Sequence, residues 1–203
     1  ILARENPNGR THVLVGSEID DSDPLWVPPR GRTVPRQAAE MADAVSAILR
    51  CSDVVIFIDP YFHPGCREKR LPLEAFLAAL IRSRPGQPPR RVEVMTSIDG
   101  PGIAEEHFRL ECDTLLPRCL PVGLTIVVRR LRQREGGEKL HTRYILTEIG
   151  GVEFGIGLDE GPPGETDDVT LLDRAQYEDR WQKYASNTPA FDEPEGQVHV
   201  RPR

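Results

Sequence analysis

The sequence predicts an α/β fold in which one mixed β-sheet is flanked by helices on both faces. Apolar runs such as D-V-V-I-F-I-D-P alternate with amphipathic segments, which is typical of strands covered by helices. Two apolar runs joined near a glycine pair follow late in the chain and predict a closing hairpin. No internal repeat is visible, and 203 residues are enough to bury one core.

The first half of the chain predicts three helices and three strands after a short strand at 11–15. Apolar residues at helical spacing indicate helices, whereas β-branched runs and alternation indicate strands. The expected elements are helices at 35–51, 73–83 and 104–116, and strands at 53–60, 91–96 and 123–128. Prolines follow the second and third helices, which marks their ends. The proline-rich segment 16–35 is expected to be a loop anchored by Trp26.

The second half predicts a hairpin and a last helix. The hairpin strands are expected at 139–147 and 151–154, with Gly150 and Gly151 in the turn because such turns require positive φ. The segment G-P-P-G-E-T-D-D at 161–168 is typical of a loop, and 173–184 has a helical pattern.

We expect three regions along the chain. Residues 1–35 form an N-terminal strand and proline-rich loop, 36–186 form the α/β domain, and 187–203 are a polar tail with at most a short strand at 197–200. The first residue is Ile1 rather than Met, so a fragment or processed product is expected, and an upstream domain is a candidate partner.

Composition excludes some classes of function. The net charge of −6 argues against a general electrostatic grip on nucleic acid. A local basic patch remains, formed by Arg129, Arg130, Arg132 and Arg134, with solvated loop ends as the alternative. No run approaches the roughly 18 apolar residues of a membrane span. Four scattered cysteines without a signal peptide favour a cytoplasmic protein, and no spacing predicts a metal or cofactor.

Two strand ends carry polar residues, where ligands of open α/β sheets bind. One is D-P-Y-F-H-P-G, with Asp59 and Tyr61, and the other is His141-x-Arg143. On a strand, residues two apart share a face, so His141 and Arg143 are expected to project together. An arginine and a histidine suit a phosphate group. The alternative is that His141 bonds locally and Arg143 pairs with a glutamate of the hairpin.

The spacing after His141 resembles the phospholipase D superfamily, which carries H-x-K, four residues, Asp, six residues, then G-S-x-N. Here the counterparts are His141, Arg143, Glu148 and the run Gly155-Ile156-Gly157-Leu158. The closer resemblance is to the phospholipase D-like C-terminal domain of proteins with an MIT domain, and to similar uncharacterised bacterial domains. That branch has a G-x-G-L-D strand and an acidic E-T-x-D segment, matched by Gly155–Asp159 and 165–168. The resemblance covers roughly residues 50–184.

The resemblance implies a single-motif phospholipase D-like domain that dimerises. Its catalytic positions would be His141, Arg143 and Glu148, and its binding positions would be Asp59, Tyr61, Gly155, Gly157, Asp159 and Glu160. Ile156 and Leu158 replace the usual Ser and Asn, so two polar groups are lost. We therefore expect recognition of a phosphate-bearing ligand (phospholipid headgroup or nucleic acid backbone) or of a protein partner. The alternative is a metal-independent homodimeric phosphodiesterase or nuclease with His141 as nucleophile.

Overall fold

A computed structural model describes residues 2–11, 13–20, 23, 29–82, 87–100, 102–186 and 190–203. It divides the chain into two compact units, Ile1–Arg32 and Thr33–Arg203. The division falls three residues before the end of the region expected at 1–35. Trp26, the expected anchor of the proline-rich loop, lies outside the described residues.

The first unit contains two short parallel strands. β1 (Leu2–Ala3) pairs with β2 (Leu14–Val15), Leu2 opposite Leu14. The strand expected at 11–15 is therefore shorter than its apolar pattern indicated.

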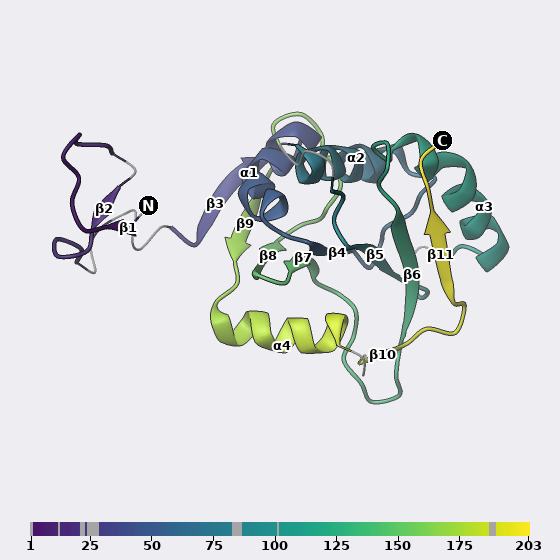
Figure 1. Cartoon of the computed structure of the whole chain (residues 1–203). Coiled ribbons are helices and arrows are strands. Elements are labelled where there is room, and N and C mark those ends of the chain that lie inside the picture. The colour runs from purple at the N-terminus through teal and green to yellow at the C-terminus, as the bar shows by residue number, and fades with distance from the viewer. Residues whose placement is uncertain are drawn as a thin grey trace. The chain divides into compact units, whose positions relative to one another are not determined.

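The second unit contains a mixed sheet, nine-stranded within the described residues (Figure 1). Its order is β10-β6-β5-β4-β7-β8-β9-β3, and β11 also pairs with β6. The strands are β3 (Gly31–Pro35), β4 (Val54–Ile58), β5 (Arg91–Ser97), β6 (Ile126–Gln133), β7 (Arg143–Thr147), β8 (Gly150–Phe154), β9 (Thr166–Leu171), β10 (Phe191–Asp192) and β11 (Gln197–Val200). The helices are α1 (Ala38–Arg50), α2 (Arg67–Ile81), α3 (Glu105–Leu115), the short 3₁₀ helix η1 (Leu116–Arg118) and α4 (Arg174–Ala185).

The sheet is covered on both faces, which confirms the predicted α/β class. α1, α2 and α3 pack on one face, where Phe76 of α2 lies 5.7 Å from Phe57 of β4 between ring centroids. α4 packs on the opposite face, where its Tyr184 stacks on Phe191 at 5.3 Å (Figure 1). Because both faces are covered, all five residues of β4 are buried, as a continuous apolar strand requires.

Helix α2 begins six residues earlier than the expected 73–83, with Pro72 inside it. Proline lacks an N–H and leaves the carbonyl four residues earlier without its helical partner. Here that carbonyl belongs to Glu68, and it accepts the N–H of Glu160 at 2.9 Å. A tertiary hydrogen bond therefore satisfies the group that the proline leaves open, which a pattern of helix breakers does not reveal.

Two segments expected to be irregular are strands. The segment 161–168 was expected to be a loop, but β9 begins at Thr166, with Asp167 and Val169 facing inward. In the expected polar tail 187–203, the short strand foreseen at 197–200 is present as β11, whereas β10 was not expected, and both pair with β6. Their apolar residues Phe191 and Val200 are buried, and β6 extends to Gln133 as their partner.

The hairpin of β7 and β8 turns through Glu148 and Ile149 rather than through the two glycines. Gly150 and Gly151 lie in β8, and neither has a positive φ. A Cβ at Gly151 would lie 2.6 Å from Leu146, so this glycine permits close packing instead of a turn.

No helix within the described residues is long and apolar enough to cross a membrane.

Candidate functional site

Strand register brings Asp59 and Arg143 together at one edge of the sheet. β4 and β7 run antiparallel with Ile58 opposite Tyr144, so the residue after β4 lies next to the first residue of β7. β4, β5 and β6 are parallel and end at this edge. Ligands of open α/β sheets bind beyond the carboxyl ends of such strands, so Asp59 and Arg143 lie at an edge where a ligand site is expected.

The Arg143 guanidinium lies over the Tyr61 ring, with Cζ 4.9 Å from the ring centroid. Arg143 is half-buried, and its buried Nε has no hydrogen-bond partner among the described residues. Within the part of the chain that the structure describes, Arg143 does not pair with a glutamate of the hairpin. The aromatic face holds the planar cation in place.

Asp59 is the buried end of a chain of alternating charges. Its Oδ1 accepts the N–H of Tyr61 at 2.9 Å, and its Oδ2 lies 3.6 Å from Nζ of Lys69. Lys69 also approaches Asp159 at 3.8 Å, and Asp159 pairs with Arg36 at 2.9 Å. Burial raises the pKa of Asp59, and the Lys69 charge and the Tyr61 N–H oppose that rise. The cluster fixes the base of the site.

A cavity of about 130 Å³ opens at the same edge. Its walls include Tyr61 after β4, Ser97 and Asp99 around the end of β5, and Gln133 at the end of β6. Lys139 from the segment before β7 adds an exposed cation. With water occupying about 30 Å³, the cavity has room for roughly four waters or one compact polar group.

The predicted common face of His141 and Arg143 is wrong. β7 begins at Arg143, not at the expected residue 139, and the chain bends at Thr142. His141 therefore precedes the strand and is exposed, and the two-residue period of a strand does not apply to it.

The position of Glu148 also contradicts its expected place beside Arg143. It follows the far end of β7, about 17 Å along a five-residue strand. Its carboxylate accepts the N–H groups of Asp53 and Val54 at 2.5 and 2.9 Å. Glu148 thus caps the start of β4 and lies away from the site.

The glycine-rich run after β8 is already occupied by a carboxylate. The buried Asp167 accepts the N–H groups of Ile156 and Gly157 at 2.9 and 3.3 Å. A Cβ at Gly155 would lie 3.0 Å from Asp167, and one at Gly157 would collide with Asp159. The two glycines therefore leave room for the carboxylates of Asp167 and Asp159. In this structure they serve internal packing, whereas ligand binding was expected of them.

Asp159 and Glu160 likewise serve internal contacts. Asp159 pairs with Arg36 and Lys69, as described above. Glu160 accepts the N–H of Ala38 at 3.0 Å and so caps the N-terminus of α1. Neither side chain hydrogen-bonds Arg143 or His141 among the described residues.

The two positions that depart from the phospholipase D motif differ in environment. Ile156 is 49% exposed, whereas Leu158 is buried in the core beneath α1 and α2. Neither offers a polar side chain to a ligand.

The basic patch is largely neutralised by the C-terminal strands. Arg130 pairs with Glu195 at 2.7 Å, Arg129 with Glu193 at 2.7 Å, and Arg134 with Asp192 at 2.8 Å. Arg132 is exposed. Most of the positive charge of β6 is therefore unavailable to a polyanion.

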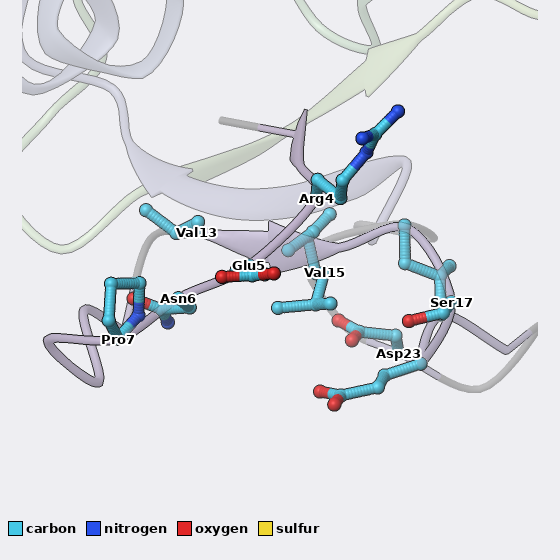
Figure 2. Close-up of a pocket in the computed structure, with 11 residues that line it drawn as sticks. Arg4, Glu5, Asn6, Pro7, Val13, Val15, Ser17 and Asp23 are labelled. Atoms are coloured by element: carbon cyan, nitrogen blue, oxygen red, sulfur yellow. The ribbon is translucent and has the colours of Figure 1, made fainter.

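A second cavity, of about 740 Å³, lies in the first unit (Figure 2). Its lining includes Arg4, Glu5, Ser17 and Asp23, and Figure 2 shows Arg4 pointing away from the two labelled carboxylates. The polar groups do not converge, so this hollow has no defined site chemistry. Among the described residues, no group of three or more His, Cys, Asp and Glu side chains is arranged to hold a metal ion.

No known family model matches the chain, and a search of curated proteins finds no significant match.

Lys69, Lys139 and Arg36 contribute to the site and were missed from the sequence. Lys69 follows Pro-Tyr-Phe by seven residues, and that proximity to Tyr61 was its only signal. The helix that positions Lys69 was expected to begin later in the chain. Arg36 fell within the helix expected at 35–51, but α1 begins at Ala38, and no motif singled this arginine out.

Proposed function

We propose that this chain contains a phospholipase D-like domain that recognises a compact phosphate-bearing group at Arg143 and acts as a homodimer, without turnover. The observation that carries the proposal is the state of Arg143. Its guanidinium is half-buried and held over Tyr61, and within the described residues it makes no hydrogen bond or ion pair, although Asp59 lies near enough to interact with it electrostatically. Asp59 is already engaged by Lys69 and by the N–H of Tyr61, so a ligand anion is the hydrogen-bonding partner that Arg143 lacks.

The surroundings of Arg143 support a phosphate ligand. The adjacent 130 Å³ cavity, which shares Tyr61 with Arg143, offers Ser97 and Lys139. A planar arginine, an ammonium group and a hydroxyl are donors that match phosphate oxygens.

Binding is favoured over turnover because several parts of a phosphodiesterase cradle are absent here. Glu148 caps β4 at the far end of its strand, and Asp167 occupies the N–H groups of Ile156 and Gly157. Loss of one preorganised donor typically costs about 10²-fold or more in rate. Arg143 and the adjacent cavity therefore support recognition better than catalysis.

The ligand class follows from charge. A nucleic acid backbone needs a row of available cations, but Arg129, Arg130 and Arg134 are paired with carboxylates. A single phosphate group, as on a lipid headgroup or a free phosphomonoester, needs only one strong donor cluster. The four free cysteines support a cytoplasmic location for this interaction.

Binding can be tested with Arg143→Ala against a matched control, Arg174→Ala. Arg174 is an arginine of α4 whose side chain is 90% exposed and pairs only with its helix neighbour Glu178 among the described residues. Calorimetry with inorganic phosphate, and sedimentation with phosphatidylinositol-phosphate or neutral vesicles, separate a free phosphate from a headgroup. We expect at least tenfold weaker binding for Arg143→Ala and no change for Arg174→Ala, since a charge-assisted hydrogen bond contributes about 1.5–3 kcal/mol. Equal losses in both variants would contradict a specific site, and preferred binding to single-stranded DNA would contradict the ligand class.

The alternative, a homodimeric phosphodiesterase or nuclease, requires His141 from two chains to meet across a two-fold axis. A phosphodiesterase and nuclease screen with EDTA present, comparing wild type with His141→Ala, tests it. We expect no turnover in either protein. Activity that persists in EDTA and disappears in His141→Ala would refute a binding-only domain.

A further inference from the structure

A thiol, an imidazole and a carboxylate lie in line outside the site at Arg143. Sγ of Cys66 is 3.5 Å from Nδ1 of His63, and Nε2 of the same ring is 2.6 Å from Oε2 of Glu111. Cys66 and His63 come from the segment between β4 and α2, whereas Glu111 belongs to α3. The carboxylate fixes the ring orientation, and the ring presents its other nitrogen to the sulfur, as in enzymes with an activated cysteine.

The backbone around this group is shaped to hold it. A Cβ at Gly65 would collide with the Glu111 carboxylate and lie 2.8 Å from Nε2 of His63, so only glycine admits the pair at this position. The N–H of Cys66 bonds the carbonyl of His63 at 3.1 Å, and Arg70 donates to the carbonyl of Pro64. These bonds fix the short loop that places the sulfur beside the ring.

Cys66 also stands at the N-cap of α2, a helix of 15 residues. The positive end of a helix dipole favours a thiolate over a thiol. The side chains of His63 and Glu111 are 22% and 14% exposed, and Cys66 is half-buried, so the group is partly open to solvent. His107, on the surface of α3, lies 3.3 Å from the other oxygen of Glu111.

We propose that Cys66 is a nucleophilic thiol, activated by His63 and positioned by Glu111, that takes low-molecular-weight disulfides to form a mixed disulfide. The thiol proton passes to Nδ1 of His63, and the sulfur attacks one sulfur of the disulfide. A new S–S bond forms to Cys66 while the disulfide of the small molecule breaks. The departing thiolate accepts the proton from His63 and leaves as a thiol.

Disulfide exchange suits this group better than acyl transfer. An acyl substrate requires preorganised donors for its oxyanion, and the N–H of the nucleophile is commonly one of them. Here that N–H of Cys66 is bonded to the carbonyl of His63. Exchange between sulfurs needs no oxyanion donor, only a thiolate and an acid for the leaving group.

The other cysteines provide internal controls. Cys51 is exposed, whereas Cys112 and Cys119 are buried. The full chain is treated with iodoacetamide or oxidised glutathione, and each cysteine is followed by peptide mass spectrometry. We expect Cys66 to react about tenfold faster than Cys51, although it is less exposed, because a free thiol is only a few per cent thiolate at pH 7. Cys112 and Cys119 remain unlabelled while the fold is intact.

Two substitutions distinguish activation from exposure. His63→Gln is expected to slow Cys66 to the rate of Cys51, and Glu111→Gln, which retains the side-chain size, to slow it several-fold. The labelling rate of Cys51 should be the same in both variants. Labelling of Cys112 would show that a variant is unfolded. If His63→Gln is unfolded, the labelling rate of Cys66 in Glu111→Gln decides the test. Equal rates for Cys66 and Cys51 in the wild type, or an unchanged Cys66 rate in Glu111→Gln, would overturn the proposal. So would a rate that changes with EDTA, which would indicate a bound metal instead.

Discussion

Replacement of Glu148 by Ala should weaken the fold and leave ligand binding intact. The Glu148 carboxylate accepts two backbone N–H groups at the start of β4, from Asp53 and Val54 at 2.5 and 2.9 Å. The Val54 bond is partly buried, whereas Glu148 itself is exposed, so water can replace part of what is lost. A comparable carboxylate cap on a helix contributes about 0.5–2 kcal/mol, so we expect about 1–2 kcal/mol here.

Urea unfolding measures this loss, and thermal unfolding should show a melting temperature lower by about 3–6 °C for a chain of this size. Phosphate affinity, measured on the same samples, should equal that of the wild type because Glu148 follows the far end of β7 from Arg143. Glu148→Gln separates charge from size and should lose less. An unchanged melting temperature together with weaker phosphate binding would refute the structural role and restore Glu148 to the site.

Three further predictions test other parts of the structure. Glu195→Gln should lower the free energy of unfolding by about 2–3 kcal/mol in urea unfolding, because it leaves the 3% exposed Arg130 without its charged partner; a loss below 0.5 kcal/mol would contradict this. Burial raises the pKa of Asp59 above its usual 3.8, so the folded state retains that proton longer than the unfolded chain. The resulting stabilisation is present below the unfolded pKa and lost as pH rises through the folded one. Asp59→Asn should therefore gain stability relative to wild type as pH rises above 3.8, and a difference that does not change with pH would contradict the shift. Gly151→Ala should cost about 1–3 kcal/mol because its Cβ would lie 2.6 Å from a β7 leucine, whereas Gly150→Ala, with a nearest contact of 3.5 Å, should be nearly neutral, and equal effects would contradict the packing.

The buried strands and most helices follow from local pattern. The run at β4 is apolar at every position because helices cover both faces, and that arrangement is legible in the residues themselves. By contrast, β9, β10 and β11 form by pairing with strands that are distant in sequence. Acidic residues such as Asp167 and Glu195 suggest a loop or a tail when the sequence is considered alone. In the structure Asp167 accepts a backbone N–H, and Glu195 pairs with an arginine.

The candidate site was only partly predictable from the sequence, because some of its contacts also depend on residues distant in the chain. Asp59, Tyr61 and Arg143 follow from strand ends that meet, which is a property of the sheet topology. The place of His141 depended on where β7 begins, and the strand begins four residues later than expected, which leaves His141 outside it. The group around the Cys66 thiol contains His63 from the same loop and Glu111 from α3, which is 45 positions after Cys66. No linear motif indicated this group.

The position of a bound anion tests the central claim most directly. A crystal structure of the full chain with phosphate, refined beside a phosphate-free crystal, should show the anion within hydrogen-bond distance of the Arg143 guanidinium and next to Tyr61. Such density would agree with Arg143 as the phosphate donor. Phosphate bound elsewhere, with Arg143 instead turned onto Asp59, would contradict it.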